Sequence, residues 1–277
     1  ATRLAEVDPR RALELLALAA EGASLALDAE AAREIAVLAQ SLDVGGNEHD
    51  EFFIGLLIGF AQQLAGDVGP GITAIRKALA AAEDEADDVD LMLAAGRAGF
   101  YVGDDAAAHR FHDRIVSRAR SIGSVGCLAI AGTRVALAEM LVGRWTAANA
   151  TAEETERLAR DTGQSELEAH ALIWRGLIAA WRGEEERCRE FVERARAITA
   201  THPMSLIDDA ARWALGVLEL GAGRPGAAFG QLEPIAHPVV VLLASLDWIE
   251  AAARAGRQEA QRGLDGLSAF AAASGAP

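Results

Sequence analysis

The sequence contains little lysine, tyrosine or cysteine. The shortages of tyrosine and of cysteine each argue against a class of protein. Lys77 is the only lysine and Tyr101 the only tyrosine. With few β-branched runs beside that single tyrosine, a β-sheet protein is disfavoured. The two cysteines, Cys127 and Cys188, are far apart and form no CxxC pair. Neither a disulfide framework nor a zinc ribbon is therefore indicated.

Positive charge is also scarce. The chain has 26 Lys and Arg residues against 41 Asp and Glu, which gives a formal net charge of −15. A nucleic-acid-binding surface needs a basic patch that displaces counterions from phosphates, so we expect this chain to make no direct contact with DNA or RNA. The sequence has no signal peptide and no apolar run of membrane length. We expect a cytoplasmic chain with no membrane contact.

What the sequence does have is alanine, the strongest helix former. Hydrophobic residues make up 51% of the 277 residues, which is enough for a continuous core. Proline is scarce inside the periodic stretches, so little interrupts the helices that the composition favours. The composition therefore predicts an all-α protein.

Glycines recur along the chain at a spacing of about 40 residues. Each is followed by a turn residue and flanked by apolar helical stretches. A glycine that supplies a positive φ ends a helix and starts a turn. Successive glycines of the series are 37, 40, 40, 40 and 33 residues apart, which indicates an internal repeat built of helix pairs. The series is Gly66, Gly103, Gly143, Gly183, Gly223 and Gly256.

Two further series of small residues keep the same register. A glycine inside a helix costs about 1 kcal/mol relative to alanine, so its repetition at one position predicts close approach between helices. Small residues stand seven positions before the turn at Gly59, Gly96, Ala136, Gly176 and Gly216, and five positions after it at Gly71, Ala108, Ala148, Cys188 and Ala228.

The beginning of the chain fits the same scheme. Leu27-Asp28 takes the turn position, and Asp8-Pro9 is a typical helix start. The segment 41–50 (SLDVGGNEHD) reads as a loop between the first and second pairs. We therefore predict one repeat domain over 1–277, with a first unit at 1–43 and further repeats over 50–277.

This register resembles the tetratricopeptide repeat, which also carries small residues before and after a turn glycine. The resemblance spans nearly the whole chain. The period of about 40 exceeds the usual 34, so the helices must be longer, and most aromatic positions of the standard repeat are lost. The resemblance implies an α-solenoid of about seven helix pairs wound into a right-handed superhelix, in which each repeat contacts mainly its neighbours.

Three segments also resemble the helical-repeat region of LuxR-type (MalT-like) large ATP-binding transcriptional regulators. They are 136–164 (ALAEMLVGRWTAANATAEETERLARDTGQ), 211–238 (ARWALGVLELGAGRPGAAFGQLEPIAHP) and 246–277. In that family the repeats follow an ATPase and precede a helix-turn-helix DNA reader, and are taken to sense an inducer or a protein partner. The resemblance implies a middle regulatory module that signals to those two domains of the same parent chain.

This chain departs from the family pattern at both ends, since it has no Walker A motif and no basic helix-turn-helix. We therefore assign no residue of this chain to ATP binding or DNA binding. A stand-alone interaction scaffold that binds a partner peptide or helix remains the alternative. An enzyme is the weakest hypothesis, because the sequence contains no nucleophile elbow, no HExxH and no local Cys–His signature. No cofactor is expected.

The tetratricopeptide pattern places one set of side chains on the concave face of the array. The set is largely apolar with aromatic members, a composition suited to a small molecule or a helix. Arg97 and His170 would orient the ligand, with Tyr101, Trp181 and Trp213 as walls. The other interpretation is that a tight superhelix buries this face as core. The set is Phe53, Leu56, Phe60, Leu93, Arg97, Phe100, Tyr101, Leu137, Met140, His170, Ile173, Leu177, Trp181, Trp213, Val217 and Leu220.

Four other segments mimic binding sites. The run 66–73 has the glycine spacing of a phosphate-binding loop, but Ile72 replaces its lysine and no strand precedes it. The residues His109 and His112 share a helix face without a third spaced ligand, so we expect a solvated face there. We expect His49 in a loop without a function. The acidic run 83–90 lacks the glycine of an EF-hand, and we interpret it as a solvated loop.

Overall fold

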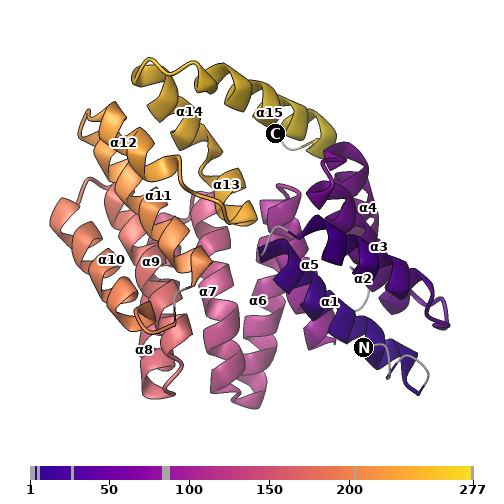
Figure 1. Cartoon of the computed structure of the whole chain (residues 1–277). Coiled ribbons are helices and arrows are strands. Elements are labelled where there is room, and N and C mark those ends of the chain that lie inside the picture. The colour runs from indigo at the N-terminus through magenta and orange to yellow at the C-terminus, as the bar shows by residue number, and fades with distance from the viewer. Residues whose placement is uncertain (1–3, 5–6, 26–27, 83–87, 203, 276–277) are drawn as a thin grey trace. The chain divides into compact units, whose positions relative to one another are not determined.

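The structure, a computed structural model, describes residues 4, 7–25, 28–82, 88–202 and 204–275 (Figure 1). Most of these residues are helical. These residues contain fifteen α-helices and no strand. Within the same residues, no helix combines the length and the apolar composition needed to cross a bilayer. The helices are α1 (Pro9–Leu25), α2 (Ala29–Gln40), α3 (Glu48–Leu64), α4 (Val68–Ala81), α5 (Val89–Tyr101), α6 (Asp105–Ile122), α7 (Val125–Leu141), α8 (Trp145–Asp161), α9 (Ser165–Trp181), α10 (Glu185–Thr199), α11 (Ser205–Gly221), α12 (Pro225–Leu232), α13 (Pro238–Leu243), α14 (Ser245–Arg254) and α15 (Glu259–Ser274).

The helices form pairs at the positions that the glycine series predicts. The pairs are α1–α2, α3–α4, α5–α6, α7–α8, α9–α10, α11–α12 and α14–α15, with the short helix α13 before the last pair. The prediction of an all-α helical-repeat solenoid is confirmed.

All six glycines of the series end the first helix of their pair with a positive φ. At Gly183, φ is 72°, and its N–H donates to the carbonyl of Ala180 at 3.0 Å. The next N–H, that of Glu184, reaches back to the carbonyl of Ala179 at 2.9 Å. These are the two hydrogen bonds of a Schellman motif, which satisfies carbonyls that the helix end leaves free.

Replacing Gly183 by alanine is expected to lower the free energy of unfolding by about 1 kcal/mol, because an L side chain disfavours the left-handed conformation. A Cβ there meets no atom within 4 Å, so the cost is conformational rather than steric. Gly230 in α12 also has open space but no positive φ, and Gly230→Ala is expected to be neutral or stabilising. Urea unfolding measures the change in the free energy of unfolding for both variants. Equal losses of stability in Gly183→Ala and Gly230→Ala would contradict this account.

The two series of small residues are buried, as predicted, where the helices of a pair approach closely. A Cβ added to Gly59 would lie 2.4 Å from a side-chain carbon of Ile75 and 2.8 Å from the carbonyl oxygen of Gly71. A Cβ added to Gly71 would lie 2.7 Å from the carbonyl oxygen of Gly59. At Gly216, a Cβ would lie 2.6 Å from Leu232. The small residues therefore set the distance between the two helices.

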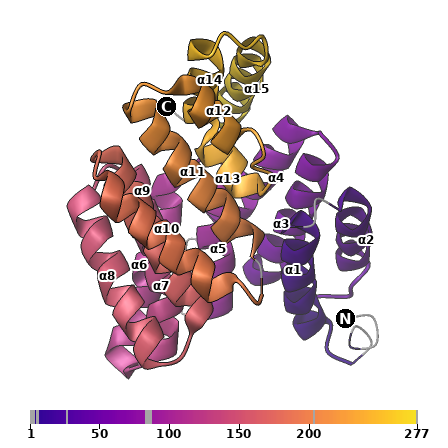
Figure 2. The same cartoon turned by 60° about the vertical axis from the view of Figure 1, so that its left-hand side comes forward.

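The chain divides into two compact units, one made of residues 1–111 and 269–277 and the other of residues 112–268. In the first unit, α1, α2 and α3 pack against one another, α3 packs on α4, and α5 packs on both α3 and α4. In the second unit, each helix from α7 to α11 packs on the helix that follows it in the chain; Figure 2 shows this unit with α10 and α11 toward the viewer. There α9 contacts both preceding helices and both following ones, so each repeat buries its apolar face on its neighbours.

The structure corrects the end of the loop predicted over 41–50. Helix α3 begins at Glu48, because the side chain of Asn47 accepts a hydrogen bond from the N–H of Asp50 at 3.0 Å. Asparagine is a preferred N-cap, and three carboxylates in the first turn favour the positive end of the helix dipole. The turn predicted at Leu27-Asp28 lies partly outside the described residues, but Asp28 caps α2 by accepting from the N–H of Ala31 at 2.9 Å.

An ion-pair network on Glu156 of α8 joins three consecutive helices of the second unit. The Glu156 side chain is only 6% exposed and pairs with Arg160 of its own helix, Arg175 of α9 and Arg194 of α10. Arg175 is 13% exposed and also covers the ring of Phe191, with its guanidinium carbon 4.5 Å from the ring centre. Although burial raises the pKa of Glu156, hydrogen bonds from Arg194 and Arg175 hold it below its ordinary value.

Candidate functional site

The residues predicted for the concave face are mostly well packed. Nine aliphatic or phenylalanine members are buried in their units, and they form core there: Phe53, Leu56, Phe60, Phe100, Leu137, Ile173, Leu177, Val217 and Leu220. The members that keep partly exposed surface include Arg97, Tyr101, His170 and Trp181. Leu93 is also partly exposed, while the four named members are polar or large aromatic residues of the kind that a ligand site uses.

In the first unit the structure brings two of the predicted residues together. The rings of Phe60 in α3 and Tyr101 in α5 meet edge to face with their centres 4.8 Å apart. The carbonyl of Tyr101 accepts a hydrogen bond from the side chain of Gln63 at 3.4 Å. Helices α3 and α5, each the first of its pair, thus contribute an aromatic pair, and the partly exposed Arg97 lies one turn before Tyr101 on α5.

In the second unit, three tryptophans from three helices form a continuous row, here called the tryptophan row. The rings of Trp145 at the start of α8 and Trp181 at the end of α9 stack with centres 5.4 Å apart and an interplanar angle of 16°. Trp181 then meets Trp213 of α11 edge to face at 5.7 Å. Trp145 was missing from the sequence prediction, because it begins a second helix of a pair and the pattern assigned only first helices to the face.

The tryptophan row is anchored at its buried end. The indole N–H of Trp213 donates to a carboxylate oxygen of Asp247 in α14 at 2.7 Å. Burial raises the pKa of Asp247, while the hydrogen bond from Trp213 works in the opposite direction. A buried indole N–H normally finds such a partner, and here the partner fixes the plane of Trp213.

The two remaining predicted residues, Met140 and His170, also belong to the second unit. Met140 is buried near the end of α7. The Nδ1 atom of His170 lies 3.1 Å from the carbonyl oxygen of Glu166, to which it donates a hydrogen bond when it carries the proton. Desolvation, together with the positive charge of Arg134, lowers the pKa of His170 from 6.5 to about 4. His170 is therefore neutral at pH 7 and offers one acceptor and one donor nitrogen.

The low pKa of His170 makes a pH-dependent contribution to stability. The folded-state pKa lies below the unfolded value, so the unfolded chain binds the extra proton between pH 6.5 and about 4. Stability is therefore full above pH 6.5 and falls as the pH drops toward 4. Because the ring is partly exposed, we expect a discounted loss of about 1–2 kcal/mol.

His170→Gln should reduce that loss when urea unfolding is compared at pH 7 and pH 5. His202→Gln is the matched control, because His202 is exposed. If wild type and His170→Gln lose the same stability over this interval, the assigned pKa direction is wrong.

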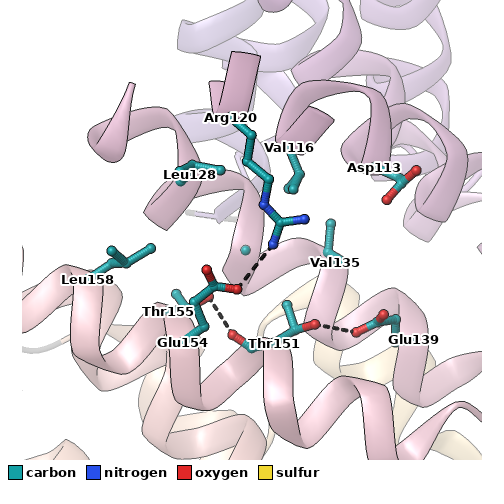
Figure 3. A pocket seen from close by; sticks show the side chains of 11 residues that line it. Asp113, Val116, Arg120, Leu128, Val135, Glu139, Thr151, Glu154, Thr155 and Leu158 are labelled. Atoms are coloured by element: carbon teal, nitrogen blue, oxygen red, sulfur yellow. Dashed lines mark hydrogen bonds and ion pairs between the residues drawn. The ribbon is translucent and has the colours of Figure 1, made fainter. Parts of the chain in front are cut away.

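A small polar cavity lies between α6, α7 and α8 in the second unit (Figure 3). Its volume is about 100 Å³. Arg120 donates to Glu154 across it at 3.1 Å, and the hydroxyl of Thr151 donates to Glu139 at 2.8 Å. Typical ligand pockets measure about 300–1,000 Å³, so this cavity suits ordered water. No sequence pattern predicts this cavity, because its lining comes from three helices. The lining residues are Asp113, Val116, Arg120, Leu128, Gly132, Val135, Glu139, Thr151, Glu154, Thr155 and Leu158.

The structure supports the structural interpretation of the phosphate-loop-like run 66–73. Helix α4 begins at Val68 and the run follows a helix rather than a strand. Gly71 is buried against Gly59 rather than open to a phosphate. Burial raises the pKa of the Cys188 thiol to about 11, so this cysteine is a small core residue and not an activated nucleophile.

Two histidines differ from the sequence interpretation. His112 is buried in α6 rather than on a solvated face. His49 lies in α3, not in a loop, and is buried between two carboxylates: its Nδ1 is 3.2 Å from Asp50 and its Nε2 is 3.2 Å from Asp88, just before α5. Arg10 of α1 donates to the same Nδ1 at 3.3 Å. The cluster ties three helices of the first unit together.

The described residues contain no group of three His, Cys, Asp or Glu side chains arranged to hold a metal ion. Of the acidic run 83–90, residues 83–87 lie outside the described part of the chain. Asp88 caps α5 by accepting from the N–H of Leu91 at 3.0 Å, as a helix-start carboxylate does.

Neither of two comparisons with known proteins finds a relative: no protein-family model matches the chain, and no curated protein matches it.

Proposed function

We propose that the chain is the regulatory helical-repeat module of a LuxR-type transcriptional regulator, in which the repeats bind an effector or a protein partner. The observation that supports this best is the tryptophan row, together with the neutral, partly exposed His170 of the same unit. Rigid aromatic walls and a few polar groups are the usual composition of a ligand site. The assignment of Phe60, Arg97 and Tyr101 of the first unit to a ligand or partner groove stays a prediction.

The mechanism we propose is differential binding. An effector that prefers one arrangement of the repeats shifts the equilibrium between two states of the parent protein by its difference in affinity for them. The ATPase and the DNA reader of the family would be the domains that respond. This chain itself contributes no ATP-binding or DNA-binding residue.

A stand-alone scaffold for protein interactions is the second candidate. It is favoured by Trp145, a residue that is 38% exposed. An exposed tryptophan of this kind serves protein binding without any attached domain.

The test uses the natural gene product, tagged at its chromosomal locus and purified from source cells. The proposal predicts that the product hydrolyses ATP and binds promoter DNA, and that His170→Ala changes at least one of these activities severalfold. His202→Ala is the control that should change neither. A product with neither activity would contradict the regulator and leave the scaffold.

A further inference from the structure

The outer end of the tryptophan row lies on the protein surface. Trp145 is 38% exposed, and Val142, three residues earlier in the turn between α7 and α8, is 41% exposed. The ring of Trp181 stacks on that of Trp145 and is partly exposed itself. Stacked indoles offer a large rigid apolar area at little entropic cost, and tryptophan is enriched where proteins bind one another.

Two arginines flank this stack and have no acidic partner. Arg144 directly precedes Trp145, and Arg182 directly follows Trp181. Both arginines are exposed, and neither makes a salt bridge or a side-chain hydrogen bond with any described residue. Elsewhere in the same unit, Arg187 pairs with Glu184 at 2.6 Å. Each arginine is next to one of the stacked tryptophans in the sequence, and in a chain of net charge −15 the two supply positive charge that pairs with no described carboxylate.

The start of α8 adds to this positive charge. Arg144 occupies its N-cap position and provides no side-chain cap. In the preceding pair, Asp104 stands at the same register and accepts a hydrogen bond from the N–H of Ala107 at 2.9 Å. The first N–H groups of α8 therefore have no capping carboxylate of the kind that Asp104 provides for α6. The positive end of the α8 dipole lies at Arg144 and Trp145.

We propose that this surface, here called the indole–arginine edge and made of Val142, Arg144, Trp145, Trp181 and Arg182, binds an acidic peptide segment that carries a large apolar side chain. The apolar side chain packs on the two indoles, and the flanking carboxylates pair with the two guanidinium groups. The edge shares Trp145 and Trp181 with the tryptophan row, but the binding requires no effector, ATPase or DNA reader, so this inference goes beyond the proposed regulator.

Charge favours a peptide over a nucleic acid or a membrane. Nucleic acids and anionic lipid surfaces are bound through many cations, whereas this edge provides two in a strongly acidic protein. Two discrete carboxylates match two guanidinium groups without exposing the rest of the acidic surface to a dense polyanion.

The test titrates the full 277-residue chain with the peptide acetyl-Ser-Gly-Glu-Phe-Leu-Glu-Gly-Ser-amide, which carries two carboxylates and contains no tryptophan. We expect saturable binding by calorimetry that weakens as salt is raised. We also expect the indole N–H signals of Trp145 and Trp181 to shift in two-dimensional NMR, while that of Trp174 stays in place.

The decisive variant is Arg144→Glu/Arg182→Glu, which should weaken binding by at least about tenfold. The matched control, Arg33→Glu/Arg262→Glu, makes the same charge change at two exposed arginines without acidic partners and should leave the affinity within about twofold. Circular dichroism checks that both variants stay folded.

Three results would overturn the inference. The first is that both double variants weaken binding equally, which would show a general charge effect. The second is that the chain prefers a lysine-based version of the peptide. The third is that single-stranded dT12 or vesicles of phosphatidylserine and phosphatidylcholine bind through Arg144 and Arg182 while the acidic peptide does not.

Discussion

Removing the charge of Glu156 is expected to lower the free energy of unfolding by about 3 kcal/mol, because the largely buried guanidinium of Arg175 loses its close, buried partner and keeps only the exposed Glu153 at 4.0 Å. The variant is Glu156→Ala, measured by urea unfolding at pH 7. This loss of stability is smaller than the loss expected for a fully buried ion pair. The guanidinium groups of Arg160 and Arg194 are partly exposed, so water can solvate them once Glu156 is gone.

The direction of the pH effect follows from the lowered pKa of Glu156. A carboxyl with a folded pKa below its unfolded value of 4.5 contributes stability above pH 4.5 and loses it as the pH falls through the folded value. Wild type and Glu156→Ala should therefore converge in stability under acid conditions.

The matched control for Glu156 is Asp161→Ala on the same helix. Asp161 pairs with Arg157 at 3.7 Å, and both side chains are well exposed. Exposed pairs contribute between about 0 and 1 kcal/mol. Comparable losses in the two variants would show that the network on Glu156 does not hold α8, α9 and α10 together.

Replacing Gly59 by alanine should cost about 2 kcal/mol, although alanine is the better helix former by about 1 kcal/mol. The added methyl group would lie 2.4 Å from Ile75 and 2.8 Å from the Gly71 carbonyl oxygen. The backbone oxygen cannot move aside without parting α3 from α4. Gly59→Val should cost more, because its larger side chain needs more room.

Gly22 provides the control in the same unit. It lies inside α1, and a Cβ added to it meets no atom within 4 Å. Gly22→Ala should therefore stabilise the chain by roughly 0.5–1 kcal/mol. Opposite signs at Gly59 and Gly22, measured by the midpoint of urea unfolding, separate close packing from helix propensity. Stabilisation by both substitutions would contradict the assigned role of Gly59.

The sequence was sufficient to predict the repeat because the repeat depends on local and periodic requirements. A turn such as that at Gly183 needs a positive φ, and a contact such as that of Gly59 with Gly71 needs small residues at fixed spacing. Both requirements recur once per pair and so leave a visible period. The same logic placed Cys188 among the small residues between helices, and it is buried.

The candidate site was only partly predictable, because its contacts join residues far apart in the chain. Nothing in the local sequence links Trp213 to Asp247 or Glu156 to Arg194, which are separated by 34 and 38 residues. The prediction that His49 lies in a loop is wrong, because Asn47 caps α3 and the helix begins before His49. The buried position of His49 depends on partners from α1 and from the start of α5, which are distant in the sequence.

The intact mass of the natural gene product in source cells tests the central claim most directly. The proposal that this chain is a regulatory module between an ATPase and a DNA reader predicts a mass several-fold larger than the 29.0 kDa of the chain itself. Top-down mass spectrometry of the tagged product provides the value. A mass near 29.0 kDa would contradict the regulator and identify a free-standing scaffold.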